Sequence, residues 1–332
     1  MFARAIGDPL RYGYAVGRVR VLEARLLGRS TYERLADAPA FEDQKRILSE
    51  TVYGGLLERA HTSVDVELAL DRALEELYVD LLERSNLPEP FVSLLRVQHD
   101  YDNLKAKLRA EALGIPIDEM LEPLGRVPAE AFGPTGRLTG RLAETEAAAR
   151  ASAAGPDGQL MPEIADRVVD AAMLTDMRLN AEESGSAFLR DLVRLLIDSG
   201  NVRVFVRGRA RELTAAAVWP MLPEGGSLER RDLAALYRLP LPEAVERLAR
   251  AGELRRASVE KLVDPERTDV ALDTELARFL HRAHRIAVGP EPVLAYVMSM
   301  RSQNQAVRTL LLGKLAGVSV DVLRGRMRET VV

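Results

Sequence analysis

The sequence predicts an all-α fold built from three similar helical repeats. The main observation is that a segment of the first third returns near the C-terminus: residues 88–95 (PEPFVSLL) are matched by residues 290–297 (PEPVLAYV). Further along, residues 113–118 (LGIPID) are matched by residues 316–321 (AGVSVD), with one extra residue in between. Apolar residues recur at helical spacing, and the alternation typical of strands is nearly absent. An internal repeat of this size decides the architecture before any single motif does.

A middle copy is expected about 100 residues after the first, if the unit has that length. Leu192 and Val193, followed by residues 201–203, supply it. An apolar residue followed by aspartate also recurs in all three copies, at Asp71, Asp170 and Asp273. Turn-forming segments rich in glycine and proline lie between the copies. We therefore expect three helical repeats, at residues 1–132, 133–226 and 227–332.

The N-terminal part of the first repeat is predicted to consist of short helices. Residues 14–27 have the apolar spacing of an amphipathic helix. Ser30 and Glu33 have the spacing of a capping box, which predicts that a second helix begins there. The next helix, residues 41–52, is expected to end at the glycine pair 54–55, because glycine readily adopts the left-handed conformation that closes a helix.

A longer helix is predicted over residues 66–82, and the prolines at 88 and 90 favour the start of another at Phe91, since proline is tolerated in a first helical turn. The polar stretch 99–103 then interrupts the apolar pattern. Asp, Asn and Ser compete for backbone hydrogen bonds, so we expect a bent or broken helix at this place. Similar polar stretches occur in the other two copies, at residues 198–201 and 301–304.

One segment alternates as a strand would, residues 202–206 (VRVFV). Its counterparts in the other copies, residues 103–108 and 306–311, have helical spacing instead. Because equivalent segments of a repeat should share their structure, we predict a helix here too.

The composition excludes several classes of protein. The chain has 332 residues, 47% of them hydrophobic and 29% charged, and a formal net charge of −4, which argues against a general nucleic-acid binder. It contains no cysteine, so disulfides and thiolate chemistry are excluded, and a reducing cytoplasm is compatible with this. No apolar run reaches the roughly 20 residues that span a bilayer, and no signal-peptide core is found near the N-terminus. We expect a cytoplasmic chain without a direct membrane span.

No catalytic, metal or cofactor site is predicted. His281 and His284 are three residues apart, as two metal ligands could be, but arginines flank them and no third ligand is positioned. Residues 133–137 (GPTGR) superficially resemble a phosphate loop but lack its motif and a preceding strand, so a turn is expected. No nucleophile elbow occurs. The prediction is a non-catalytic protein.

A recurring basic position is the one candidate contact site. Arg203 and Arg207 lie one turn apart on a predicted helix, and Lys105 and Arg308 occupy matching positions in the other copies. Two interpretations stay open. These residues form a solvated stripe beside a buried one, or they form a basic surface that meets an acidic partner.

Several motifs together resemble a known family. They are residues 14–20 (YAVGRVR), 48–55 (LSETVYGG), 102–104 (DNL) and 293–297 (VLAYV), and the likeness covers essentially the whole chain. The sequence resembles the C subunit of the bacterial and archaeal V-type (A-type) ATPase/ATP synthase, which is similar to the d subunit of the eukaryotic vacuolar enzyme. The middle copy departs from the pattern, because it lacks a glycine at the place of Gly114 and Gly317.

The resemblance implies three helical lobes around a pseudo-threefold axis, forming a funnel with a central cavity. It also implies a non-catalytic rotor component that links the central shaft to the membrane proteolipid ring and so supports rotary proton or sodium transport. The implied partners are the D-type and F-type stalk subunits and the ring, at the cytoplasmic face of the membrane. An alternative from the residues alone is a helical scaffold that binds an acidic protein or nucleic acid through the basic stripe. An enzyme would require a catalytic constellation that the sequence lacks.

Overall fold

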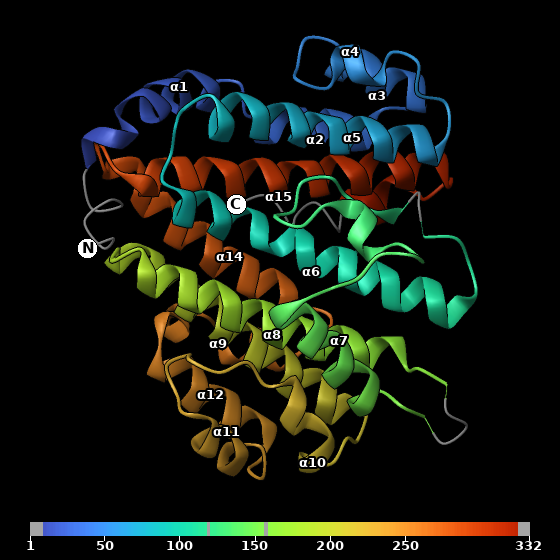
Figure 1. The fold of residues 1–332 in the computed structure, drawn as a ribbon. Coiled ribbons are helices and arrows are strands. Elements are labelled where there is room, and N and C mark those ends of the chain that lie inside the picture. The colour runs from blue at the N-terminus through green and yellow to red at the C-terminus, as the bar shows by residue number, and fades with distance from the viewer. Residues whose placement is uncertain (1–8, 118–119, 156–158, 325–332) are drawn as a thin grey trace. The chain divides into compact units, whose positions relative to one another are not determined.

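The computed structural model describes residues 9–117, 120–155 and 159–324. These residues form two compact units (Figure 1). One unit contains Pro88–Phe279, and the other combines Asp8–Leu87 with Leu280–Val332. The predicted division into three repeats is a different partition of the chain, based on sequence recurrence, and it stays a prediction.

The unit containing Pro88–Phe279 is built around three long helices. They are α6 (Glu89–Leu113), α8 (Pro162–Glu183) and α9 (Ala187–Ala210). Pro90 lies in the first turn of α6, as predicted. Shorter helices cover these three: η4 (Ala129–Phe132), α7 (Gly140–Ser152), α10 (Ala215–Val218), η5 (Trp219–Met221), α11 (Arg230–Leu236), α12 (Leu241–Ala251), η6 (Glu253–Arg256), α13 (Val259–Val263) and α14 (Thr268–His281).

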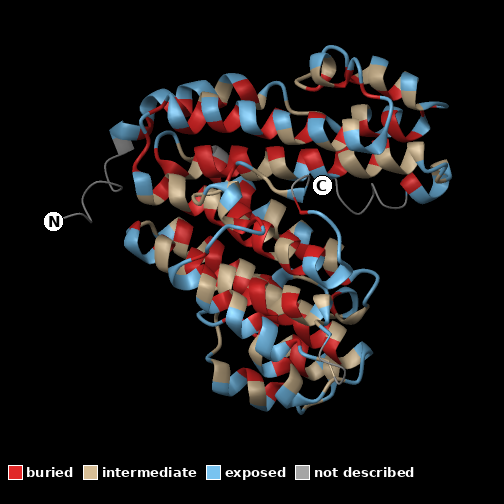
Figure 2. Ribbon diagram, turned by 45° about the vertical axis from the view of Figure 1, so that its right-hand side comes forward, coloured by how far each residue is buried: buried red, intermediate tan, exposed pale blue. Residues whose placement is uncertain are grey.

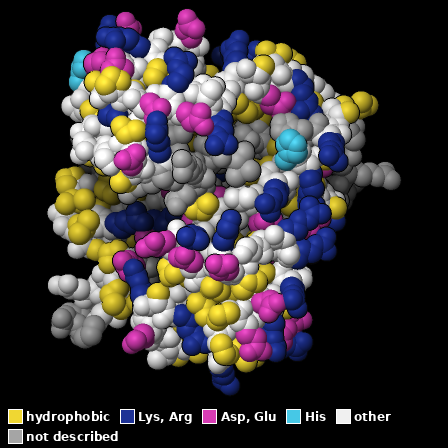
Figure 3. All heavy atoms as spheres, turned by 180° about the vertical axis from the view of Figure 1, so that it is seen from behind, with side chains coloured by type: hydrophobic (Ala, Val, Ile, Leu, Met, Phe, Trp, Pro, Cys, Tyr) yellow, Lys and Arg dark blue, Asp and Glu magenta, His cyan; other side chains and the backbone are white. Residues whose placement is uncertain are grey.

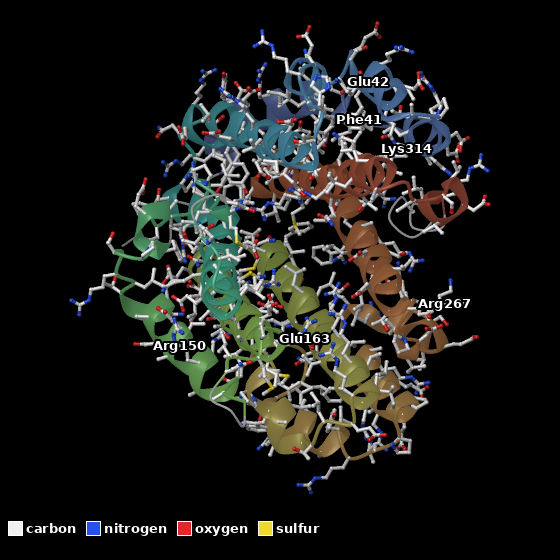
Figure 4. All side chains as sticks on the ribbon, turned by 90° about the vertical axis from the view of Figure 1, so that its right-hand side faces the viewer. Phe41, Glu42, Arg150, Glu163, Arg267 and Lys314 are labelled. Carbon is white, nitrogen blue, oxygen red and sulfur yellow. The ribbon has the colours of Figure 1, made fainter. Side chains whose placement is uncertain are left out.

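The other unit is organised around α15 (Pro290–Leu315), against which α1 and α5 pack. Its remaining helices come mostly from the N-terminal part of the chain: η1 (Pro9–Tyr12), α1 (Gly13–Glu23), α2 (Arg29–Asp37), α3 (Phe41–Leu48), α4 (Gly54–Leu57), α5 (Ser63–Tyr78), the π-helical turn η2 (Val79–Glu83) and η7 (Arg282–Arg285). Phe41 and Glu42 of α3 and Lys314 of α15 lie in the same part of this unit (Figure 4).

The all-α prediction is confirmed. Within the described ranges the structure contains helices and no strand, and the only strand-like feature there is an isolated bridge between Ala154 and Leu160. The alternating segment 202–206 lies inside α9, as its repeat counterparts predicted. Buried side chains follow the inward sides of the long helices, and exposed residues lie on their outward sides (Figure 2). This is the pattern expected of amphipathic helices around a core.

The prediction that these helices are broken was wrong, and the alternative that they are bent stays a prediction. The polar stretches at 99–103, 198–201 and 301–304 lie within α6, α9 and α15, and each of these helices is uninterrupted. Most of the polar side chains in these stretches are buried, and several of them bond to segments outside their own helix. The competition with the helix backbone that the sequence suggested is therefore avoided, because tertiary partners take up the hydrogen bonds.

Two helix-end predictions also needed correction. The α2 helix begins at Arg29 after Gly28, close to the predicted start, but Ser30 and Glu33 lie inside the helix and do not cap it. A capping box is formed by Thr62 and Asp65, at the start of α5. The α3 helix ends at Leu48, well before the glycine pair. Gly54 opens α4 instead, and its lack of a side chain is required because a Cβ there would lie 2.0 Å from the Ser49 carbonyl oxygen.

The segment 48–55 contributes two buried side chains to the hydrophobic core of this unit. Leu48 and Tyr53 are fully buried in a cluster that also includes Leu70 and Val307. The Tyr53 hydroxyl donates to Asn304 Oδ1 at 2.6 Å and accepts from Gln303 Nε2 at 3.0 Å. The polar stretch of α15 is thus bonded to the most distinctive motif of the N-terminal region.

Candidate functional site

The candidate basic residues lie where a long helix meets a shorter one from another predicted repeat. Lys105 is on α6, which packs against α8, and Arg203 and Arg207 are on α9, facing residues of α14. Arg308 is on α15, which packs against α5. A long helix of each predicted repeat therefore meets a helix of the next predicted repeat, and the third meets the first.

At the α6–α8 junction, the Lys105 ammonium lies 3.0 Å from Asp170 and 2.6 Å from Asp102. Burial opposes its charge, but Asp102 and Asp170 outweigh this cost and raise the pKa of Lys105 to about 12. One turn further along α6, Arg109 pairs with Asp166 of α8 at 2.5 Å. Two basic residues of α6 thus face two acidic residues of α8.

The α9–α14 junction has the same arrangement. Arg203 lies 2.8 Å from Asp269 and 3.4 Å from Asp273, and Arg207 lies 2.6 Å from Asp269. Burial would raise the pKa of Asp269, but the two guanidinium groups outweigh it and lower that pKa. Burial dominates at Asp273, whose pKa is raised. The arginines thus compensate one of these carboxylates more fully than the other.

At the α5–α15 junction, Arg308 bridges the two acidic residues. Its guanidinium lies 2.6 Å from Glu67 and 3.2 Å from Asp71. The recurring aspartates of the sequence are therefore the partners of the recurring basic residues. The sequence reasoning missed the acidic residue one turn before each of them, although a pair with helical i, i+4 spacing recurs in all three copies. The acidic residues missed are Glu67, Asp166 and Asp269.

These ion pairs give every candidate contact residue a role inside the chain. The side chains are partly exposed, and such pairs typically contribute less than about 1 kcal/mol each to stability. Over the face shown in Figure 3, Lys and Arg side chains are interspersed with Asp and Glu. Whether the same residues also contact a partner is not tested by this arrangement, and that role stays a prediction.

A second recurring feature is a buried polar side chain in the middle of α6, α9 and α15, which binds a loop. We call this side chain the anchor. Asp100 of α6 accepts hydrogen bonds from the backbone amides of Arg126 (2.8 Å) and Val127 (3.0 Å). Asp198 of α9 accepts one from the Ser227 amide (2.8 Å). Gln303 of α15 accepts one from the Leu27 amide (2.7 Å). Each of these three helices thus fixes a loop through a buried side chain, which satisfies backbone groups that would otherwise need water.

The type of residue that precedes the bound amide in each loop correlates with the length of the anchor side chain. Gly125 and Gly226 precede the amides held by the two aspartates, and a Cβ at either would lie 2.3 Å from a carboxylate oxygen. At the third anchor the preceding residue is Leu26. Gln303 has one more methylene than aspartate, so it reaches its loop without the close approach that requires glycine.

The remaining candidates have structural interpretations. The His281 side chain is exposed, and the His284 side chain lies outside the described residues. Gly133 and Gly136 form a turn after η4, with Gly136 close to the carbonyl groups of Glu130 and Ala131. In the part of the chain that is described, no group of three His, Cys, Asp or Glu residues is arranged to hold a metal ion. Among the same residues, none of the helices has the length and apolarity needed to cross a bilayer.

The described residues define an all-α protein whose charged clusters connect helices to one another and to loops. The whole-chain comparison adds the family. The model of the ATP synthase (C/AC39) subunit matches residues 15–326, and the chain therefore belongs to this family. Its members are non-catalytic subunits of the V-type ATP synthase complex, in agreement with the prediction that this chain is not an enzyme.

Similar proteins come from bacteria and archaea. The C subunit of the V-type sodium ATPase of Enterococcus hirae is 22% identical over 318 residues, which is 94% of this chain and 96% of that protein. The C subunit of the A-type ATP synthase of Thermococcus kodakarensis is 26% identical over 93% of this chain and 88% of its own length. The C subunit of the V-type ATP synthase of Thermus thermophilus is 33% identical over 206 residues, covering 58% of this chain and 61% of the relative.

Proposed function

We propose that this chain is a central-stalk component of a rotary ATPase, which couples the central shaft to the membrane proteolipid ring. The observation that carries the proposal is the family match over residues 15–326. The partners proposed are the D-type and F-type stalk subunits and the ring. The chain would act at the cytoplasmic face, peripheral to the membrane through the complex, and would support rotary transport of protons or sodium ions.

The mechanism proposed is mechanical. A rotor adaptor must transmit torque without bending, and a helical framework tied together by ion pairs and buried anchors is suited to that task. We propose three repeats, 1–132, 133–226 and 227–332, arranged around a pseudo-threefold axis as a funnel with a central cavity. The order of the junctions supports this: α6 meets α8, α9 meets α14, and α15 meets α5, an order that returns to its starting repeat.

Co-sedimentation tests the proposed function. The purified chain is mixed with detergent-solubilised proteolipid ring, with and without the stalk subunits. We expect binding to both, with one copy of the chain per ring. A chain that is helical and folded but binds neither would contradict the rotor function and favour the scaffold alternative.

The contact residues are a separate proposal: Lys105, Arg203, Arg207 and Arg308 help to seat a neighbouring stalk protein. We expect Arg203→Gln, Arg207→Gln and Arg308→Gln together to weaken assembly about tenfold, because charge complementarity steers and holds such interfaces. The matched control replaces Arg29, Arg150 and Arg247, which also pair on exposed helix surfaces, and has the same change in net charge.

The unfolding midpoint of each variant separates the two roles of these arginines. A normal midpoint with weakened assembly supports the partner contact. Normal assembly with a lowered midpoint would mean that the arginines serve only the junctions inside the chain.

A further inference from the structure

The first two helical segments, η1 and α1, have a row of exposed residues that the core does not use. Leu10 is 83% exposed, Tyr14 67% and Val21 54%, and the exposed Gly17 lies between the last two. Leu10 lies in η1, the 3-10 turn directly before α1, and the spacing of three and four residues places Tyr14, Gly17 and Val21 along one side of α1. We call these four residues the α1 stripe. Exposed apolar residues gathered on one helix face are unusual on a protein surface and indicate a binding surface.

The opposite side of α1 is fully employed in packing. Ala15, Val16, Val19 and Leu22 are buried, and α1 packs along α15. The helix is thus apolar on two sides, one packed against α15 of its own unit and one exposed. The core face of α1 is therefore a different face from the α1 stripe, and the core contacts of α1 do not explain the stripe.

The segment that carries the stripe is positively charged, although Arg18 pairs with Asp80 and Arg20 with Glu23. Residues 9–25 contain four arginines and one glutamate, although the whole chain has a net charge of −4. Arg11, Arg18 and Arg25 are exposed. The Arg18 side chain remains 42% exposed although it pairs with Asp80 at 2.8 Å. An exposed apolar row bordered by arginines is complementary to a surface that is apolar within and anionic at its boundary.

The same unit contains a contrasting helix. On α5, Val64 is 57% exposed and Leu68 is 63% exposed, so its apolar exposure is comparable. These residues are bordered by acidic side chains, including Asp65 and Glu67, and α5 contains a single basic residue, Arg72. An anionic surface would repel this helix, so charge distinguishes α1 from other exposed apolar positions.

We propose that the α1 stripe is a direct docking surface for anionic lipid. Leu10 and Val21 would enter the boundary between headgroups and acyl chains, and the Tyr14 ring would lie at that boundary with its hydroxyl in water. The arginines would bind lipid phosphates, which attract basic side chains near a membrane surface. This inference rests on the proposed function, which brings the chain to the membrane. It adds a lipid contact to the contacts proposed with protein subunits.

The test measures sedimentation of the full chain with lipid vesicles that contain no ring protein. Vesicles of phosphatidylcholine alone are compared with equimolar phosphatidylcholine and phosphatidylglycerol. We expect binding to the anionic vesicles only, decreasing as salt is raised. The variant Leu10→Ser, Tyr14→Ser, Val21→Ser should bind at least about tenfold more weakly, because three apolar side chains no longer leave water.

The matched control is Val64→Ser, Leu68→Ser, which removes similar apolar exposure from the acidic helix and should bind like the wild type. Unchanged unfolding midpoints show that both variants fold, as expected for exposed positions. Equal binding to both kinds of vesicle, or anionic binding that the α1 substitutions leave unchanged, would overturn the proposal.

Ring binding in detergent, measured with the same proteins, keeps this inference separate from the proposed function. Loss of ring binding in the α1 variant, without any vesicle binding by the wild type, would assign the stripe to a protein partner and overturn the lipid contact. Failure of the wild type to bind the ring, with anionic vesicle binding intact, would overturn only the rotor function.

Discussion

The long helices α6 and α9 place an aspartate at the same point but compensate its charge differently. Asp100 is fully buried, and its carboxylate lies 2.6 Å from the Arg126 guanidinium, which also bonds to Asp176 at 2.9 Å. Asp198 is 1% exposed and bonds to the hydroxyl and amide of Ser227. One anchor is an ion pair, whereas the other is a carboxylate held by neutral donors.

At two further pairs of equivalent positions, the first copy is again better stabilised than the middle copy. Asn103 exchanges two hydrogen bonds with the backbone of Glu122, whereas the buried Oδ1 of its counterpart Asn201 has no partner among the described residues. Beyond the helix ends, Gly114 and Glu212 both have a left-handed backbone, with φ of 65° and 53°. The missing glycine of the middle copy therefore leaves the turn conformation in place, at a cost in local strain that glycine avoids.

The comparison teaches that a repeat can keep its geometry after losing the residues that make it favourable. The anchor, the loop and the terminal turn persist in the second copy, because the surrounding packing imposes them. The interactions that stabilise these features locally, namely the ion pair, the paired asparagine and the glycine, are found in the first copy. Substitutions at equivalent positions should then have unequal and even opposite effects on stability.

The largest difference is expected when the charge compensation is removed. Arg126→Met would leave Asp100 as a buried carboxylate without this cation, and would leave Asp176 with the more distant Arg141 at 3.7 Å, so we expect a loss of about 3 kcal/mol in the free energy of unfolding. Ser227→Ala at the other anchor removes one hydrogen bond and should cost about 1 kcal/mol. Urea denaturation measures both. Arg150→Met, whose ion pairs are exposed, is the control, and a loss at Arg126 no larger than that at Ser227 would contradict the comparison.

The next difference concerns pH. Burial raises the pKa of Asp198 above its usual 3.8, against the opposing hydrogen bonds from Ser227. The native state therefore keeps this proton to higher pH than the unfolded state, and the contribution of Asp198 to stability falls as pH rises from about 4 through the raised pKa. Asp198→Asn removes the charge while Oδ1 still accepts from the Ser227 amide, and the Ser227 hydroxyl, which donates to the carboxylate in the wild type, would accept from the new Nδ2. It should gain stability relative to the wild type with rising pH, by on the order of 1 kcal/mol.

A pH series of urea denaturation curves checks this prediction. Asp100→Asn is the matched control, because it leaves the Arg126 guanidinium with one carboxylate partner fewer and should be less stable than the wild type at pH 7. If both asparagine variants lose stability at neutral pH, then Asp198 is compensated by its surroundings and the proposed contrast between the anchors is wrong.

The smallest effect is expected at the terminal turns. Glu212→Gly should raise the free energy of unfolding by up to about 1 kcal/mol, since glycine adopts the left-handed conformation without the cost that glutamate incurs. Gly114→Ala should lower it by a similar amount, although a Cβ there would meet no neighbouring atom within 4 Å. Calorimetry of the two variants tests whether backbone strain alone distinguishes these turns. Changes of the same sign would show that it does not.

The sequence was sufficient to predict that the chain is helical and that similar segments recur along it. The periodic apolar spacing predicted an all-α chain, and the recurring segments placed α9 correctly as a helix despite the strand-like residues 202–206. The motifs also indicated the family that the whole-chain comparison shows. Local hydrogen-bond chemistry was misleading at 99–103, because the sequence shows which groups compete for the backbone and does not show that a distant loop will satisfy them.

The recurring charges show the same limit. The sequence by itself determined that a basic residue follows one fixed position of each repeat and that an aspartate recurs at another, since both are properties of residue spacing. Only the tertiary structure decided that Lys105 bonds to Asp170, and that Arg308 bonds to Asp71 from the far end of the chain. The physical reason is that an ion pair requires two side chains within a few ångströms, and the packing of whole helices, which local spacing does not specify, brings them there.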